Sequence, residues 1–464
     1  MTNPPAKGDG VPAEEPAPTA GGDNGLTVPP AEQFEAAMED EAAEQAVAVE
    51  ETAAVTRRKP WILRAAIYLT TANQVMVTVY SLILAAVVGA ILIIVSDPYV
   101  RSTWGYFFSQ PGDALSASWD AVATAYGALF RGAVVDPDKL NRWFYGMADL
   151  DAVLRPIATT FNYSAPLIFT GMAVALAFRS GLFNIGAQGQ AVVGAIGAAI
   201  VGFSFTGLPT IVHLPLTLLG GLVGGAIWGA IPGVLKALTG AHEVIISIML
   251  NYIGGYLLLW VISTKFVHSP DRTDAISKPA SESALFPSLF GAGLPANWGI
   301  VLAVVVAAGM SWFLARSSLG FRFRTVGANP AAAKTAGMGV AGTYATAMAF
   351  GGGLAGLGGA TILLGSTSHA LTPSVAGTIG FDGITVALLG RAKPLGVVFS
   401  ALLFGAMQAG ASTMQTVAQI PVDMVTVLQA VIVIFIAAPA LVKGIFHLRE
   451  AKVSGQELSM AKGW

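Results

Sequence analysis

The chain has 464 residues, of which 54% are hydrophobic and only 11% are charged, and its mean hydropathy is positive. Average soluble domains carry about 25% charged residues, so this composition excludes an ordinary soluble globular protein. The absence of cysteine excludes disulfides, thiolate metal ligands and cysteine nucleophiles.

The amino-terminal segment differs sharply in charge from the rest of the chain. Residues 1–56 hold twelve acidic residues and one lysine, hence −11, so the other 408 residues carry +9 of the net −2. Residues 1–30 are rich in Pro, Gly and Ala and cannot bury enough apolar surface to order themselves. We expect a disordered acidic cytoplasmic tail over 1–56, with a soluble helix over 31–55 as the alternative. A secretory signal is not expected, because the tail starts acidic and lacks an apolar stretch before Val75.

Repeated apolar runs follow, most of them near the ~20 residues that cross a bilayer. They predict an all-α fold, a polytopic membrane helix bundle of about ten transmembrane helices. This transmembrane domain spans 57–450, and a cytoplasmic tail follows over 451–464. The eighth run is short, and is expected either to cross fully or to form a half-helix or re-entrant segment. The predicted spans are 74–96, 157–178, 184–205, 212–237, 243–264, 298–315, 343–365, 376–390, 395–412 and 423–442.

The positive charges predict the orientation. A basic cluster over 57–64 precedes the first span, and basic residues there favour the cytoplasm. With ten crossings, sixteen Lys and Arg residues lie inside against eight outside. We therefore expect an N-in and C-in topology, with extracytoplasmic loops over 97–155 and 265–297 and a cytoplasmic loop over 316–343.

The two extracytoplasmic loops differ in composition. Residues 97–155 are aromatic, and their apolar groups are broken by charge, as in helices that lie at the membrane interface. Residues 265–297 are rich in Ser and Pro. Both loops are compatible with docking of an outside partner and with a simple lid over the bundle.

A glycine stripe runs along the span 212–237. Gly221, Gly225, Gly229 and Gly233 are spaced by four and share one helix face. Small residues let membrane helices approach closely, so the stripe predicts tight packing against a neighbouring helix.

The stretch Ser180–Gln190, SGLFNIGAQGQ, puts three amide side chains at the mouth of the third span. They are Asn184, Gln188 and Gln190. In hydrocarbon each amide costs free energy unless protein or water satisfies it. We interpret them as part of a substrate pathway or gate; a packing role is the alternative.

The fifth span repeats this polar pattern. Glu243, Ser247 and Asn251 are spaced by four, so they share a face that reaches about 12 Å from the membrane surface toward the bilayer centre. A polar stripe of this kind suits a water-lined pathway. The alternative is interhelical hydrogen bonding that only fixes packing.

Asp382, in GFDGITVALLG, is a further acidic residue at membrane depth. An ionisable group there is a functional hypothesis by default. Because it lies in a Gly-rich turn, a helix-capping role is the alternative, and slightly the favoured one.

The basic loop 316–343 contains a predicted short helix. Asn329 is a plausible cap with Pro330 at the first helical position, and residues 331–336 continue the helix. We expect an exposed short helix between two spans to dock a cytoplasmic partner; an ordinary connecting loop is the alternative.

No enzyme motif is recognisable. The sequence lacks a GxxxxGK[ST] phosphate-binding loop, a paired-His zinc motif and a GxSxG nucleophile elbow. We therefore expect no catalytic residue, and any ATPase that drives transport must be another chain.

Four ordered motifs resemble the integral permease subunits of bacterial ABC importers for nucleosides, relatives of the ribose-type sugar and branched-chain amino-acid permeases. The resemblance covers about residues 60–450. The motifs are GLFNIGAQGQ (181–190), HEVIISIMLNYIGGYLL (242–258), GFRFRTVGANPAAAKTAGM (320–338) and GFDGITVALLGRAKP (380–394).

The resemblance implies a permease of the vitamin-B12-importer type in the bacterial plasma membrane. Its implied partners are a cytoplasmic ABC ATPase, a second homologous permease in a heterodimer or homodimer, an extracytoplasmic substrate-binding lipoprotein and membrane lipid, but no nucleic acid. ATP and Mg would bind to the ATPase, so no cofactor or metal is expected in this chain.

The resemblance also implies a function and its residues. The expected cargo is a small polar substrate, most of all nucleosides, with simple sugars as the runner-up. Two departures from the family pattern are Gln188 where Glu is expected and His242 where Asn is common. The expected pathway or gate residues are Asn184, Gln188, Gln190, Glu243, Ser247, Asn251 and Asp382. The expected ATPase-coupling residues are Arg322, Arg324, Asn329, Pro330 and Lys334.

Two readings from other classes stay open. A secondary transporter or channel working alone would use Glu243 and Asp382 as proton or ion sites. A non-transporting membrane scaffold is disfavoured by polar stripes that reach the middle of the bilayer.

Overall fold

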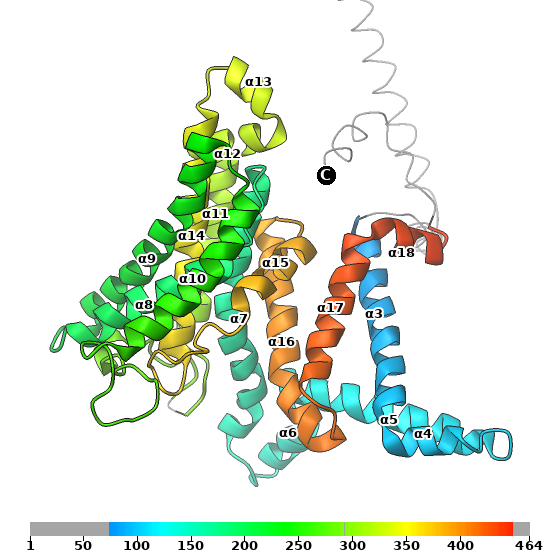
Figure 1. The fold of residues 1–464 in the computed structure, drawn as a ribbon. Coiled ribbons are helices and arrows are strands. Elements are labelled where there is room, and N and C mark those ends of the chain that lie inside the picture. Colours follow the sequence, from blue (N-terminus) through cyan, green and yellow to red (C-terminus); the bar gives the residue numbers. More distant parts are fainter. Residues whose placement is uncertain (1–73, 292, 449–464) are drawn as a thin grey trace, which may run out of the picture. The chain divides into compact units, whose positions relative to one another are not determined.

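A computed structural model of the chain describes residues 74–291 and 293–448 (Figure 1). These residues form a bundle of helices, and the only β pairing among them is two isolated bridges in one loop. The predicted tails, 1–56 and 451–464, lie outside the described residues, as does the basic cluster 57–64.

Eight of the described helices are long and apolar enough to cross a membrane. This confirms the predicted all-α polytopic bundle. They are α3 (Gln74–Ser96), α7 (Leu150–Arg179), α8 (Ala187–Ser204), α9 (Thr210–Thr239), α10 (Glu243–Ser263), α11 (Gly299–Arg316), α14 (Val340–Gly365) and α16 (Pro394–Ala418).

The two predicted loops that face one end of the bundle are partly helical. The first contains α4 (Pro98–Trp104), α5 (Pro111–Ala133) and α6 (Pro137–Phe144), none of which is a candidate span. The second contains one short 3₁₀ turn, η1 (Glu282–Ala284).

Two of the ten predicted spans differ in the structure. The segment 376–390 forms only α15 (Ile379–Leu389), whose 11 residues reach about 16 Å and cannot cross a bilayer alone. The segment 423–442 is broken into α17 (Asp423–Ala437) and α18 (Pro439–Ile445), which meet at 87°. Proline at position 439 has no N–H for the helix ladder, which accounts for the break.

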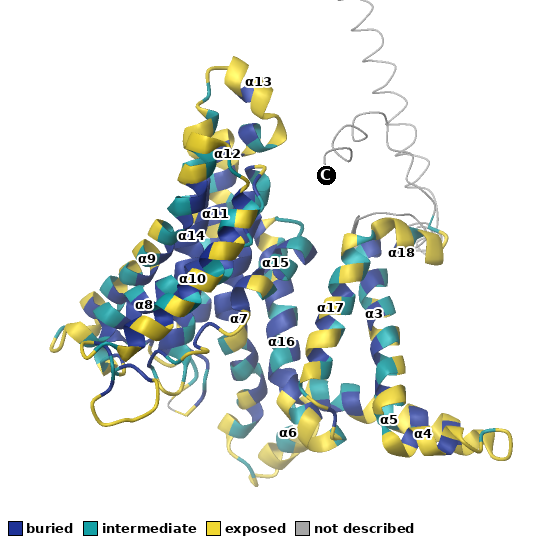
Figure 2. Cartoon of the chain, in the orientation of Figure 1, coloured by how far each residue is buried: buried dark blue, intermediate teal, exposed yellow. Residues whose placement is uncertain are grey.

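The core of the bundle lies around α7 and α14. In their apolar windows 78% and 83% of residues are buried, against 28% in α9 and α10 (Figure 2). A low buried share in an apolar helix is expected where lipid, and not protein, covers the side chains. Helices α7 and α14 are therefore the protein-covered centre.

The predicted glycine stripe packs α9 directly onto α14. A Cβ at Gly225 would meet the Gly352 carbonyl and the Gly356 backbone, and one at Gly229 would meet Gly352 again. The facing glycines of α14 meet α9 in the same way. The prediction of close helix packing is confirmed, and the partner helix is α14.

An irregular segment, residues 366–378, joins α14 to α15. The N–H of Ala280 donates to the His369 carbonyl at 2.8 Å, which ties its start to the loop after α10. That loop lies at the end of the bundle away from α13 (Pro330–Thr335) (Figure 1).

The far end of α15 lies on the α13 side. Arg179 Nε, on the last residue of α7, donates to the Ala392 carbonyl at 2.7 Å, just beyond α15. Segment 366–378 and α15 together therefore traverse the bundle as one discontinuous crossing, half irregular and half helical.

The glycine contact predicts that alanine lowers the thermal unfolding midpoint at one glycine and not at another. Gly356→Ala should lower the thermal unfolding midpoint of the purified protein, because the new Cβ meets backbone of Gly221 and Gly225 that cannot move aside. Overpacking of this kind costs about 1–3 kcal/mol.

The matched control is Gly309→Ala on α11, where a Cβ meets nothing within 4 Å. Alanine is favoured over glycine in a helix by up to about 1 kcal/mol, so this variant should unfold at an equal or higher temperature. Equal midpoints for the two variants would show that the glycine contact is not tight.

Candidate functional site

Two amides of the Ser180–Gln190 stretch satisfy each other. Asn184 Nδ2 donates to Gln190 Oε1 at 2.9 Å, and Gln190 Nε2 donates to Asn184 Oδ1 at 3.1 Å. Both residues are buried. This reciprocal pair offsets the desolvation of two amides and fixes the turn that leads into α8.

A third amide, from α10, holds the start of α8. The N–H of Gly189 donates to Asn251 Oδ1 at 2.8 Å, and Asn251 Nδ2 donates to the Ile185 carbonyl at 3.0 Å. These are backbone groups at the helix mouth, where no helical partner exists for the first N–H groups. Asn251 supplies that partner.

Gln188 joins the mouth of α8 to the mouth of α15. Its Nε2 donates to the Gly377 carbonyl and its Oε1 accepts from the Gly380 N–H, both at 2.8 Å. A carboxylate accepts only, so a glutamate here could not donate to Gly377. Glutamine, the departure from the family pattern, matches a site that needs one donor and one acceptor.

These contacts define a layer that we call the amide layer: Asn184, Gln188, Gln190 and Asn251. Ser247 lies beside it, fully buried against Gly186. The layer brings two helix starts together near the middle of the bundle. Each of its side chains is committed to protein partners, so its direct action is to hold the irregular segments.

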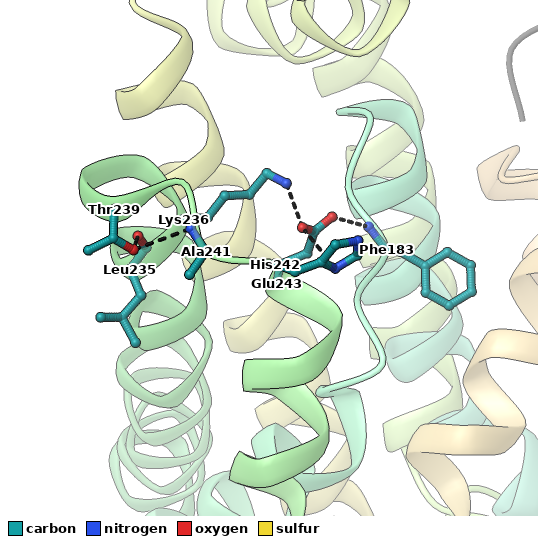
Figure 3. A network of polar contacts seen from close by, with 7 residues as sticks. All are labelled: Phe183, Leu235, Lys236, Thr239, Ala241, His242 and Glu243. Carbon is teal, nitrogen blue, oxygen red and sulfur yellow. Dashed lines mark hydrogen bonds and ion pairs between the residues drawn. The ribbon is translucent and has the colours of Figure 1, made fainter.

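Glu243 lies apart from the amide layer, in an ion pair with Lys236 (Figure 3). The Glu243 side chain is 7% exposed and that of Lys236 is 23% exposed. The N–H of Phe183 also donates to Glu243 Oε1, at 3.4 Å. The pair therefore ties the end of α9, the start of α10 and the turn before α8 together.

Tyr344 of α14 completes this cluster. Lys236 Nζ lies 5.5 Å from the centre of the Tyr344 ring, within the range of a cation–π contact. Glu243 is thus a paired group on the α13 side of the bundle.

A cavity of about 470 Å³ lies between α7, α14, α15 and α16. Its volume is in the range of small-molecule sites. Polar side chains reach it from three helices: Asn162 on α7, Asp382 on α15 and Gln408 on α16. Gly377, whose carbonyl accepts a hydrogen bond from Gln188, forms part of its wall together with Thr378.

Asp382 does not cap α15. The helix begins one turn earlier, with Thr378 as its N-cap, and the Thr378 hydroxyl donates to Asp382 Oδ2 at 2.9 Å. The capping alternative is therefore wrong. In the described part of the chain no cation pairs with this carboxylate.

The predicted short helix is present as α13, directly after α12 (Ser318–Ala328). Asn329 Oδ1 accepts from the Ala332 N–H at 3.0 Å, and Pro330 stands at the first helical position. This confirms the predicted cap. Asn329 is also the C-cap of α12, so one residue ends one helix and starts the next.

The predicted coupling residues do not share one surface. Pro330 and Lys334 line a cavity of about 600 Å³, together with Lys236 and Tyr344. Arg324 lines a separate cavity, against α16. Arg322 lies exposed on α12.

Three relevant residues were not among the predicted sites. Asn162 and Gln408 are amides inside predicted spans, and Lys236 is a lone cation seven residues before Glu243. Polarity in an apolar run was the available signal for all three. No group of three metal-ligating side chains is found among the described residues.

Several known proteins match this chain. The guanosine ABC transporter permease protein NupP of Bacillus subtilis is 34% identical over 79% of this chain and 94% of its own length. The nucleoside ABC transporter permease protein NupB of Lactococcus lactis is 36% identical over 74% and 96%. The glucose ABC transporter permease protein TsgB13 of Haloferax volcanii is 31% identical over 59% and 73%. No solved structure matches the chain.

A multi-span helical bundle with buried polar groups between its helices is typical of the membrane component of a transport system. The family model for the permease component of branched-chain amino acid transport systems matches residues 157–437, and the chain belongs to that family. It is a multi-pass permease of the plasma membrane. Membership confirms the expectation that the chain is not itself an enzyme.

The amide layer predicts the outcome of a substitution at Gln188. Gln188→Leu leaves the Gly377 carbonyl and the Gly380 N–H without this partner, at a cost of about 1–3 kcal/mol. The start of α15 should then open more often, by roughly tenfold for each 1.4 kcal/mol.

The absence of native cysteine makes this measurable. A single cysteine at Ala376, which is 2% exposed and lines the cavity, reports opening through its rate of labelling by a water-soluble maleimide. The rate should rise in Gln188→Leu and stay constant in Gln110→Leu, an exposed control on another segment. Equal rates in both backgrounds would refute a holding role for Gln188.

Proposed function

We propose that the chain is the permease subunit of an ABC importer for nucleosides. The observation that carries this is the pair of relatives named for guanosine and nucleoside transport, which align over 94% and 96% of their own lengths. The match therefore covers nearly the whole length of each relative.

The proposed topology is N-in and C-in with a vitamin-B12-importer type of fold. Counting the discontinuous crossing with the eight long helices and the bent pair α17–α18 restores ten passages. This assignment puts 97–155 and 265–297 outside and 316–343 in the cytoplasm. Within a permease domain over 57–450, the tails 1–56 and 451–464 are then cytoplasmic.

The proposed cargo path runs through the 470 Å³ cavity. The proposed path starts at the extracytoplasmic end of α14, where Gly365 and Ser366 line the cavity. It ends at the amide layer. Asn162, Asp382 and Gln408 offer a carboxylate and two amides, which suit the hydroxyls and base edges of a nucleoside. Irregular backbone at membrane depth is tolerated where it lines such a cavity, as segment 366–378 does here.

The amide layer is the proposed inner gate beneath this cavity. Gln188 spans the junction of α8 and α15, so breaking its two hydrogen bonds separates the two helix starts. In this proposal Asn184, Gln190, Ser247 and Asn251 hold the α8 side of the gate. Glu243 supports the turn before α8 by accepting from the Phe183 N–H.

The proposed drive comes from a cytoplasmic ABC ATPase that binds ATP and Mg. It would dock on α13 and on the 600 Å³ cavity beside Pro330 and Lys334. A second homologous permease and an extracytoplasmic substrate-binding lipoprotein complete the proposed importer. No cofactor is assigned to this chain.

A sugar importer is the second candidate, favoured by the glucose permease relative at 31% identity. That relative aligns over a smaller share of both chains than the two nucleoside permeases do. Family membership argues against an ion-coupled transporter working alone.

Uptake in the native host tests the cargo. Deleting the gene should abolish uptake of labelled guanosine and leave glucose uptake unchanged, and the wild-type gene should restore it. Asp382→Asn should restore it only in part, because the amide keeps the size but loses an acceptor. Loss of glucose uptake alone would establish the sugar reading, and no loss of either would refute both.

The coupling surface makes a separate prediction. Arg322→Glu with Pro330→Gly should lower uptake by roughly tenfold, equivalent to about 1.4 kcal/mol of lost interface free energy, while membrane insertion is unchanged. Less ATPase should co-purify with this variant.

The matched control is Arg142→Glu with Pro137→Gly on α6, another capped helix that starts with proline at the other end of the bundle. The amount of co-purified ATPase should match the wild type there. Unchanged ATP-driven uptake in the α12–α13 variant would remove the coupling assignment.

A further inference from the structure

Three cationic side chains surround one cavity of about 340 Å³ on the α13 side of the bundle. Arg179 ends α7, Arg324 lies on α12, and Lys393 is the N-cap of α16. The three come from sequence positions far apart, so the fold and not a local run of charge brings them together.

These charges are not neutralised within the described residues. Arg179 Nε bonds a neutral carbonyl, that of Ala392, and the like charges of Arg179 and Arg324 act on each other. No described carboxylate forms an ion pair with any of the three. Like charges around a concave site repel, and a bound anion offsets that repulsion.

Apart from Ser311, the rest of the cavity wall is apolar. Leu314 near the end of α11 and Leu395 at the start of α16 both line it, and Leu395 is 65% exposed. Both belong to candidate membrane spans, at the ends that reach the membrane surface. Cations at the headgroup level with apolar side chains beside them match the two parts of a phospholipid.

We propose that this cavity binds the phosphate of an anionic phospholipid, with one acyl chain against Leu314 and Leu395. Basic pockets between membrane helices on the cytoplasmic side are suited to such headgroups. The observations favour lipid over an acidic protein partner, because the α13 surface has its own cavity at Pro330 and Lys334.

A bound lipid would also act on the coupling loop; this consequence rests on the proposed function. Arg324 is carried by α12, while Lys393 belongs to α16. One phosphate between them would hold α12 against the start of α16. Anionic lipid would then favour a fixed position of the α12–α13 unit.

The test uses the purified full-length permease in detergent, titrated with phosphatidylglycerol and, separately, phosphatidylcholine, with bound lipid counted by native mass spectrometry. Lys393→Gln should weaken phosphatidylglycerol binding roughly fivefold and Arg324→Gln/Lys393→Gln roughly thirtyfold, since each cation near a membrane surface contributes about a factor of five. Arg179 is left in place because it bonds Ala392. Phosphatidylcholine should bind weakly throughout.

Three controls keep the test decisive. Lys443→Gln removes one cation from α18, outside this cavity, and should leave binding unchanged. Lys393→Arg keeps the charge and should retain binding, and an unaltered unfolding midpoint shows that each variant is folded.

Four results would overturn the proposal. The first is phosphatidylglycerol binding by the double variant that equals binding by the wild type. The second is phosphatidylcholine binding that equals phosphatidylglycerol binding. The third is competition by inorganic phosphate at matched concentration, which would mean a free-anion site. The fourth is reduced co-purification of ATPase with unchanged lipid binding, which would assign the cations to a protein partner. Loss of lipid binding with normal guanosine uptake would leave the proposed transport function intact.

Discussion

The structure depends on one constraint, that backbone polar groups at membrane depth must have partners inside the protein. Two segments break the helical ladder there, the turn before α8 and the stretch before α15. The side chains of Asn251 and Gln188 provide the missing donors and acceptors at 2.8–3.0 Å. Without them each orphaned group would cost about 1–3 kcal/mol. Few side chains therefore decide whether the irregular crossing is tolerated.

The glycine contact between α9 and α14 complements this polar arrangement. The amide layer joins elements by directional hydrogen bonds, while the glycines allow two helices to touch along their backbones. A hydrogen bond of the amide layer can be broken at little cost where another donor or acceptor replaces the lost partner. The glycine contact between α9 and α14 cannot be separated without opening a void between the helices. The bundle thus combines a close backbone contact between α9 and α14 with a hydrogen-bonded contact between α8 and α15.

Most of the fold could be predicted from the sequence, because length and hydropathy alone identify a membrane span. The boundaries of α3 and α10 and the cap at Asn329 were predictable for this reason and from local capping chemistry. The split at Ala438 and the half-length of α15 were missed or left open. An apolar run shows that a segment prefers hydrocarbon, but not where its helix stops.

The candidate site was predicted less well, for a physical reason. The sequence shows which polar residues are present, and spacing places Glu243, Ser247 and Asn251 on one face. It does not show partners, so the ion pair of Glu243 with Lys236 was not predicted. Asn162 and Gln408 meet Asp382 only through packing of three helices. Positions 162 and 382 are 220 residues apart, and a meeting over that separation leaves no periodic signal in a single chain.

The shared cap at Asn329 has a mechanical meaning. Asn329 is the one residue between α12 and α13, and it caps both helices, so the two are joined without a longer linker. A movement of α13 would therefore reach α12 through this one residue. The backbone of Gly327, two residues before Asn329, lies against Gly181 at the end of α7. Helix α12 therefore connects α13 to the turn that leads into the amide layer.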